Sequence, residues 1–440
     1  MTALFSVPEE SKKGKPFPGL KYLKVFFILI LFCFPCCSKR QLTETSPQVD
    51  AAPEFWIRVL LLDDVNNVRL GLNSSFSIVP GGNSEKQHFS KPDRNMIVNL
   101  DSYQFAINGQ NLEGGELTIE PDEPYIFTLN ESGYRGKLRL IVNPDGSTFD
   151  VVNLVPLEPY LAGVIGAEMP NYWEPAALEA QAIAARTYCL YIKRRFGQNR
   201  HWDITKNQSN QVYIGMAAES GQVWKAINQT YGQVLVCKNP DGTTGIFPAY
   251  YSSSCGGHTE DSQNVFGEQT PQSLKGVPCP YCQYVAKPDF FLWPMVKVDK
   301  AFVSQMLINK YPTLNRLEKI VSIIPDEQGD YVVRIDNLQS HISRLTRIKL
   351  AGSNGKTDVL RAEDLRSVID PTGRKIKSTI FKINDVGDYW VFSEGRGWGH
   401  GVGMCQCGAQ AMARMEMKTA KQILSYYYPG SSVEYVYKEK

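Results

Sequence analysis

The sequence predicts an α+β fold, with a β-rich N-terminal part, a central alanine-rich helix and helices at the C-terminal end. Three observations indicate this class. Short apolar or alternating runs, bounded by Gly, Asn, Asp or Pro, begin at Phe55, as expected for strands joined by tight turns. An alanine-rich stretch follows, and a glycine-rich turn then precedes two helical patterns near the C-terminus.

The strand patterns are clearest over four short segments in the first 150 residues. Each places apolar and polar residues in alternation or in a brief apolar run, which is typical of strands with one buried face. They are Trp56–Leu60, Val68–Leu72, Ser75–Val79 and Leu138–Val142.

The first predicted helix begins with Pro175, at a position where the missing N–H costs nothing, and continues to about Phe196 before Gly197. Its many alanines allow other backbone segments to approach closely, so we expect it to be central. At the C-terminal end, one helix is predicted over roughly 404–417. A second is predicted from Thr419, where Gln422 completes a capping box, to the stop at 429–430.

Composition indicates a folded protein rather than a disordered one or a nucleic-acid binder. The chain has 440 residues, of which 43% are hydrophobic and 21% charged, enough for one large core or several domains. Its formal net charge is +2, which provides no general attraction for a polyanion.

The N-terminus carries the features of an export signal. Five lysines precede the apolar run Val25–Cys37, which is shorter than the roughly 20 residues of a membrane span but suits a secretory signal. We therefore expect residues 1–40 to be a signal sequence or a membrane or lipid anchor, and the protein to be extracytoplasmic. Cleavage, retention and lipidation at Cys33, Cys36 or Cys37 are all open. Residues 41–54, polar with Thr, Ser and Pro, are expected to form a linker.

Glu168 is the strongest candidate for a catalytic acid. It is the only charged residue in the run 161–170, and desolvation in such surroundings raises a carboxyl pKa toward the range that a general acid needs. The alternative is a glutamate whose side chain simply reaches solvent at the end of a strand, before Pro170.

Other polar candidates follow in the chain. Arg186 lies among small apolar residues of the predicted central helix, so it needs either an anionic ligand or a structural ion-pair partner. Gln211 and Tyr213 provide amide and phenol groups of the kind that bind sugars, although any loop could contain them.

Two short-spaced pairs predict a metal site, namely Cys255 with His258 and Cys279 with Cys282. This layout matches a tetrahedral Zn²⁺ site, in which four protein ligands leave no open position, so the role would be structural. The alternative in an exported protein is a disulfide among the three cysteines.

The glycine-rich turn 395–403 allows positive φ angles and close approach of a ligand. His400 within it could bind a ligand, act as a base, or simply pack in the turn. Cys405 and Cys407 are too close in sequence to bridge each other easily, so pairing with Cys189 or Cys237 and remaining free are both open.

Four motifs in order resemble those of the sporulation protein D/amidase enhancer family. They are 157–161 with Glu168-Met169-Pro170, then 180–188, then 251–259, and finally 399–404. The resemblance covers residues 55–435. We divide that span into a β-rich part (55–150), a part with the catalytic and zinc motifs (151–287), a divergent or inserted segment (288–391) and the C-terminal motif with its helices (392–435). The inserted segment shows a helical pattern over 301–310 and a strand pattern over 331–335.

The resemblance implies a peptidoglycan lytic transglycosylase that acts in cell-wall remodelling, division or sporulation. Enzymes of this kind cleave the β-1,4 bond between N-acetylmuramic acid and N-acetylglucosamine in peptide-stripped glycan strands, leaving 1,6-anhydro ends. It implies that Glu168 is the acid/base and that Arg186 supports activity. The implied substrate-binding residues are Gln211, Tyr213, Ser253, Ser254, His400, Gly401 and Gln406, and the implied zinc ligands are Cys255, His258, Cys279 and Cys282.

Cys405 and Cys407 depart from the family, which usually has Ser and an aromatic residue there. The alternative function is a non-catalytic enhancer of a partner amidase, whereas a zinc peptidase is disfavoured because a His-Glu-x-x-His motif is absent.

Overall fold

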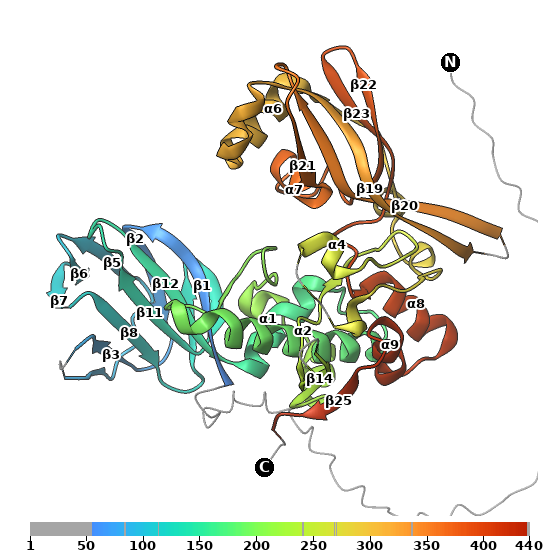
Figure 1. Cartoon of the computed structure of the whole chain (residues 1–440). Helices are drawn as coiled ribbons and strands as arrows, with labels where there is room; N and C mark the ends of the chain where they lie inside the picture. The colour runs from blue at the N-terminus through green and yellow to red at the C-terminus, as the bar shows by residue number, and fades with distance from the viewer. Residues whose placement is uncertain are drawn as a thin grey trace, which may run out of the picture. The chain divides into compact units, whose positions relative to one another are not determined.

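The computed structural model describes residues 55–437, apart from 83–84, 113, 240–241, 268, 270 and 336–337 (Figure 1). The predicted signal segment and linker, with the three N-terminal cysteines, lie outside the described residues. No helix within the described ranges is long and apolar enough to cross a membrane. The described part combines several β-sheets with nine α-helices, so the predicted α+β class is confirmed.

Two mainly antiparallel sheets form the N-terminal part. In spatial order, the larger sheet contains β13 (Ile204–Thr205), β1 (Trp56–Val65), β12 (Phe149–Pro156), β11 (Lys137–Val142), β8 (Glu116–Pro121), β3 (Phe76–Pro80) and β4 (Gln87–Phe89). The smaller sheet contains β10 (Ser132–Arg135), β9 (Ile126–Leu129), β2 (Asn67–Leu72), β5 (Met96–Asp101), β6 (Gln104–Ile107) and β7 (Gln110–Leu112).

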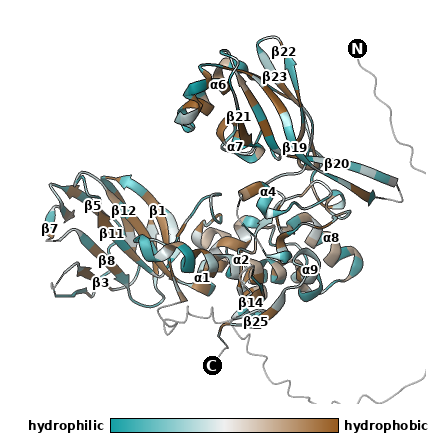
Figure 2. Ribbon diagram, in the orientation of Figure 1, coloured by the Kyte–Doolittle hydropathy of each residue, from teal (hydrophilic) through white to brown (hydrophobic). Residues whose placement is uncertain are grey.

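These sheets bury one face of each strand, as the alternating sequence predicts. Along β8, buried and half-buried residues alternate, because successive side chains of a strand point to opposite faces. The alternation of hydropathy along the strands can be followed in Figure 2. Phe105 of β6 packs edge-to-face on Phe149 of β12, with ring centroids 5.3 Å apart, so the two sheets share one apolar core.

The central helix is α2 (Pro175–Phe196), as predicted. It contacts α1 (Leu157–Glu168), α3 (Gly221–Gln229), α8 (Gln406–Glu416) and α9 (Ala420–Tyr427). Its alanines make these close contacts possible, and five of them are fully buried: Ala177, Ala180, Ala182, Ala184 and Ala185. The predicted capping box of Thr419 and Gln422 is present at the start of α9.

Smaller elements complete this central part. They are the three-stranded sheet of β15 (Thr244–Ile246), β14 (Gln233–Lys238) and β25 (Ser432–Tyr435), the parallel pair β16 (Tyr251–Ser252) and β24 (Met404–Cys405), α4 (Ser262–Phe266), α5 (Pro288–Phe291), and the 3₁₀ helices η2 (Gly197–Asn199), η3 (Gly215–Ala218), η4 (Gln272–Leu274) and η5 (Cys282–Tyr284).

Residues 292–396 build a second hydrophobic core of their own, around Trp390, Phe392 and Leu365. The predicted helix 301–310 lies within α6 and the predicted strand 331–335 within β19. The elements are β17 (Leu292–Trp293), β18 (Val296–Asp299), α6 (Lys300–Lys310), η6 (Pro312–Leu317), β19 (Ile320–Ile335), β20 (Leu338–Gly352), β21 (Thr357–Arg361), α7 (Ala362–Ile369), β22 (Ile380–Val386) and β23 (Tyr389–Arg396).

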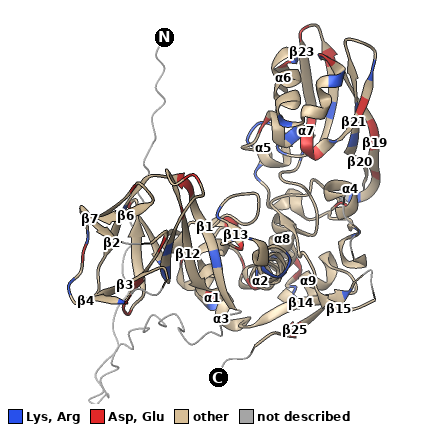
Figure 3. Ribbon diagram, turned by 60° about the vertical axis from the view of Figure 1, so that its left-hand side comes forward, with Lys and Arg blue, Asp and Glu red and all other residues tan. Residues whose placement is uncertain are grey.

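Basic and acidic residues are interspersed along the described chain (Figure 3). Many of them pair directly, as Arg139 does with Glu116 at 2.6 Å. This mixture agrees with the small net charge of +2, which provides no general attraction for a polyanion.

Candidate active site and metal centre

The carboxyl group of Glu168 lies at the end of α1, where the chain becomes extended at Met169. Its Oε1 accepts a hydrogen bond from the backbone N–H of Val212 at 2.9 Å. Its Oε2 lies 3.5 Å from the side-chain Nε2 of Gln406, the first residue of α8. The side chain is half-buried, so its carboxyl group is held in place while part of it stays accessible.

Burial raises the pKa of Glu168, and the hydrogen bonds from Val212 and Gln406 offset only part of that increase. No charged side chain contributes to the shift within the described part of the chain. A carboxyl group in such surroundings remains protonated closer to neutral pH than a solvated one. Glu168 can therefore donate a proton, and the Val212 N–H can stabilise the carboxylate that forms.

Two glycines of α1 explain why Val212 comes so close to Glu168. A Cβ atom at Gly163 would collide with the ring of Tyr213, and one at Gly166 would collide with the backbone carbonyl of Ala218. Because glycine has no Cβ, the segment that contains Val212 can pack directly on α1.

Gln211 and Tyr213 are buried beside this site rather than exposed to a ligand. Gln211 donates to the hydroxyl of Tyr251 at 2.9 Å and accepts from the hydroxyl of Tyr160 at 2.9 Å. Tyr213 donates to Asn153 at 2.8 Å. The predicted sugar-binding role does not agree with this placement, because these polar groups are already hydrogen-bonded inside the protein.

Arg186 lies away from solvent on α2 and forms an ion pair with Glu158 of α1. Its exposed fraction is 0%, and its Nε and Nη2 atoms donate to the two carboxylate oxygens at 2.8 and 2.6 Å. A further bond joins Nη1 to the backbone carbonyl of Gln233 at 2.9 Å. The structural ion pair, one of the two interpretations of Arg186 from sequence, is the one present. It ties α2 to the helix that ends at Glu168.

His400 is a packed residue of the glycine-rich turn. Its Nδ1 accepts from the backbone N–H of Val402 at 3.0 Å, and its ring lies against Tyr250 and Phe266. Burial lowers the pKa of His400 to about 4, so the imidazole is neutral at physiological pH. The packing interpretation of this residue therefore agrees with the structure better than a role as ligand or base.

The other predicted binding residues occupy the strand pair β16 and β24 and its surroundings. Gly401 has a φ of 75°, and its carbonyl accepts from the N–H of Glu260 at 2.8 Å. Ser254 is fully buried, whereas Ser253 is half-buried. Of the residues predicted to bind substrate, Gln406 is the one whose side chain contacts Glu168.

Four buried cysteines form a cluster next to the acid site. The Sγ atoms of Cys255, Cys279, Cys282 and Cys405 all lie within 4.8 Å of one another. The Sγ atoms of Cys255 and Cys282 are 3.9 Å apart, well beyond the S–S distance of about 2.05 Å in a disulfide. All described cysteines are free thiols, so the disulfide alternative is not what this structure contains. The cluster can hold a metal ion.

This cluster differs from the predicted ligand set at a single position, with Cys405 in the place of His258. The ring of His258 stacks on Tyr331 of β19, with centroids 3.7 Å apart and planes 6° apart, and its Nδ1 lies 2.5 Å from the carbonyl of Thr259. Cys405 joins the cluster because β16 and β24 pair in parallel, with Cys405 opposite Ser252. Local spacing cannot predict this long-range pairing, because Cys405 lies 150 residues from Cys255 in the chain.

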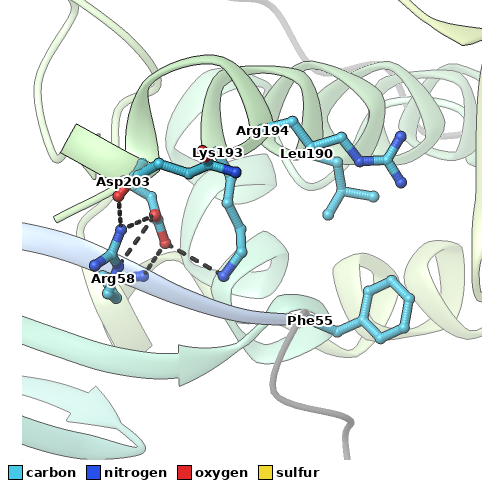
Figure 4. Close-up of a pocket in the computed structure, with 8 residues that line it drawn as sticks. Phe55, Arg58, Leu190, Lys193, Arg194 and Asp203 are labelled. Atoms are coloured by element: carbon cyan, nitrogen blue, oxygen red, sulfur yellow. Dashed lines mark hydrogen bonds and ion pairs between the residues drawn. The ribbon is translucent and has the colours of Figure 1, made fainter. Parts of the chain in front are cut away.

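A separate pocket lies at the other end of α2 (Figure 4). It has a volume of about 490 Å³, and Arg58, Lys193 and Arg194 contribute its basic groups. Figure 4 shows Asp203 between Arg58 and Lys193, with which it forms ion pairs at 2.6 and 3.5 Å. Because the carboxylate of Asp203 already neutralises part of this charge, the pocket offers a weaker anion site than its three cations suggest.

Comparison with known proteins places the chain in a family. A family model described as stage II sporulation protein matches residues 145–237. The stage II sporulation protein D of Bacillus subtilis is 30% identical over 303 residues, which covers 64% of this chain and 75% of that protein. The chain belongs to the stage II sporulation protein D family.

Two further relatives extend the comparison. An uncharacterized protein of Brachyspira hyodysenteriae is 33% identical over 307 residues, covering 70% of this chain and 74% of that protein. A Bacillus subtilis protein named amidase enhancer is 28% identical over 377 residues, covering 76% of this chain but 49% of that protein. Membership of the stage II sporulation protein D family supports a role in sporulation or in the cell wall, and the resemblance inferred from the four motifs is confirmed.

Proposed function

We propose that the protein is a peptidoglycan lytic transglycosylase. Its substrate would be a glycan strand without stem peptides, cleaved at the β-1,4 bond between N-acetylmuramic acid and N-acetylglucosamine. The observation that carries the proposal is a single half-buried carboxyl group, Glu168, whose pKa is raised by burial and which has no charged partner in the described part of the chain.

A single carboxyl group suffices for this reaction. Protonated Glu168 donates its proton to the glycosidic oxygen as the C1–O bond breaks. The resulting carboxylate then removes the proton from the muramyl C6 hydroxyl, whose oxygen forms the new bond to C1. Glu168 ends the cycle protonated, and the product has a 1,6-anhydro ring. Glycosidases that hydrolyse the bond need a second carboxyl group as base or nucleophile.

The contacts of Glu168 support both stages. Val212 donates its N–H to Oε1 at 2.9 Å, which stabilises the carboxylate after proton transfer. Gln406, at 3.5 Å from Oε2, orients the oxygen that carries the proton. The ion pair between Arg186 and Glu158 fixes α1, so we assign Arg186 a positioning role.

The test is product analysis. The purified protein would be incubated with glycan strands from which an amidase has removed the peptides, and the products would be measured by mass spectrometry. We expect fragments that are lighter by one water than hydrolysis products, as a 1,6-anhydro end requires. Fragments with ordinary reducing ends would contradict a transglycosylase and indicate a hydrolase.

We also propose that the cysteine cluster holds a structural Zn²⁺. In a tetrahedral site with Zn–S distances of about 2.3 Å, the sulfur atoms lie about 3.8 Å apart. The Sγ separation of 3.9 Å between Cys255 and Cys282 matches that geometry. Four thiolates leave no open position for a reactive water, so the ion would join the segments after β16, before η5 and at β24 without taking part in the cleavage.

A non-catalytic enhancer of an amidase is the second candidate, because the relative named amidase enhancer matches 76% of this chain. The two functions differ in their need for the acid. An enhancer would stimulate a partner amidase equally well after Glu168→Gln, whereas cleavage of glycan strands would be lost. Assaying both activities of the same variant separates the two candidates.

Either function requires access to peptidoglycan. The lysine-flanked apolar run before Ser38 supports export to the extracytoplasmic side, with residues 1–40 as signal or anchor. Fractionation of cells that produce the full chain tests this proposal, and protein found in the cytosol alone would refute it.

A further inference from the structure

The turn that follows Glu168 presents an unusually exposed aromatic ring. Tyr172 lies four residues after Glu168, and its side chain is 79% exposed, more than any other aromatic side chain in the described ranges. A ring held this open to solvent, close in the chain to a candidate acid, is available to pack against a ligand.

The backbone of this turn is fixed rather than loose. Trp173 donates its N–H to the carbonyl of Pro170 at 3.0 Å, and Glu174 donates its N–H to the side chain of Gln410 at 2.8 Å. Gln410 lies four residues after Gln406 on α8, so both side chains lie on one face of that helix. One face of α8 therefore contacts both segments: Gln406 contacts the carboxyl group of Glu168, and Gln410 contacts the turn that contains Tyr172.

A second exposed apolar residue lies on the other segment that contacts Glu168. Ile214 follows Val212 by two residues, and its side chain is 42% exposed. Val212 provides the N–H that binds Glu168. Both chain segments that flank the carboxyl group thus present an apolar side chain to solvent.

We propose that Tyr172 is a stacking platform for one saccharide ring of the glycan strand. The proposal rests on the proposed function, because it takes a peptidoglycan glycan as the substrate. One face of a pyranose ring carries several C–H groups, and these pack favourably on the electron-rich face of an aromatic ring. Four residues span at most about 14 Å, so the platform lies within a few saccharides of Glu168. Its ring therefore binds a saccharide of the strand near the bond that is cleaved.

The experiment measures binding separately from cleavage. The background is the full chain with Glu168→Gln, and the probe is peptide-stripped glycan strands, titrated by calorimetry. Tyr172→Ala tests loss of the ring, Tyr172→Phe keeps the ring without its hydroxyl, and Tyr103→Ala is the control. Tyr103 is also an exposed turn tyrosine, at 57%, but it lies between β5 and β6 of the N-terminal part.

We expect Tyr172→Ala to weaken binding about tenfold, which corresponds to about 1.4 kcal/mol, with Tyr172→Phe and Tyr103→Ala unchanged. Equal affinity of Tyr172→Ala and its parent would overturn the platform and leave the proposed function intact. An equal loss in Tyr172→Phe would also overturn it, because the contact would then depend on the hydroxyl. If the Glu168→Gln protein with Tyr172 intact bound no glycan, that result would contradict both the platform and the proposed function.

Discussion

Cys405 and Gln406 are consecutive residues that belong to two different sites. The Sγ of Cys405 is part of the four-cysteine cluster, and the Nε2 of Gln406 lies 3.5 Å from the carboxyl group of Glu168. The pairing of β24 with β16 fixes this junction, because it sets Cys405 opposite Ser252. Because one peptide bond joins Cys405 to Gln406, we expect a structural change in the cysteine cluster to shift Gln406 relative to the carboxyl group of Glu168.

The first prediction concerns the fourth metal ligand. We expect the wild-type protein to bind about one zinc ion per chain, and Cys405→Ser to bind it much more weakly, because serine removes a thiolate ligand. Elemental analysis after dialysis measures the metal content. After exchange for Co²⁺, the thiolate charge-transfer absorption should be weaker in the variant.

His258→Ala is the matched control for this prediction, since His258 lies next to the cluster in sequence but stacks on Tyr331. It should retain the full zinc content. Loss of zinc in His258→Ala together with retention in Cys405→Ser would restore the ligand set predicted from sequence.

The second prediction concerns the buried ion pair of Arg186 and Glu158. Replacing only Arg186 by Met leaves a buried carboxylate without its partner, which should cost about 3–5 kcal/mol of unfolding free energy. Adding Glu158→Gln should recover part of that loss. Chemical denaturation of both single variants and the double variant gives the coupling energy. Additive losses would mean that the two side chains do not interact.

The third prediction is a loss of stability in acid that depends on His400. Its pKa is lowered to about 4 in the folded protein, whereas an unfolded histidine titrates near 6.5. The unfolded state therefore binds the proton first, so stability is fully present above about pH 6.5 and falls as the pH decreases toward 4. Because the residue as a whole is only half-buried, we expect the loss not to exceed about 3 kcal/mol. Unfolding curves of His400→Asn should show a weaker pH dependence over this interval, and an identical dependence would contradict the assignment.

The fourth prediction concerns the cost of keeping Glu168 buried. Because burial raises its pKa in the folded protein, the group contributes stability below its unfolded pKa of about 4.3, and this contribution is lost as the pH rises through the folded pKa. Glu168→Gln removes this titration, so its melting temperature should exceed that of the wild type at neutral pH. The difference should disappear near pH 4. A variant less stable than the wild type at pH 7 would show that the carboxylate is well solvated or paired.

Local sequence patterns were enough to predict much of the fold. Strand alternation, the alanine-rich α2 and the capping box at Thr419 each depend on residues close together in the chain. The raised pKa of Glu168 was predicted in the same way, because its uncharged surroundings in sequence correspond to burial in the structure.

Features that depend on long-range contacts were predicted less well. The partner of Arg186 is 28 residues away at Glu158, and the fourth cysteine is 150 residues from Cys255. Gln211 has an amide of the kind that binds sugars, but its side chain is buried and hydrogen-bonded to Tyr160 and Tyr251. Side-chain chemistry alone does not tell a buried network from a binding site.

The most direct test of the central claim is the rate at which Glu168→Gln releases 1,6-anhydro ends from peptide-stripped glycan strands. We predict a decrease of about 10²- to 10⁴-fold relative to the wild type, as expected for loss of a general acid. Glu179→Gln is the control, because burial also raises the pKa of Glu179, which lies on α2. It should cleave at the wild-type rate. Release of anhydro ends by Glu168→Gln at the wild-type rate would contradict the role of Glu168 as the catalytic acid.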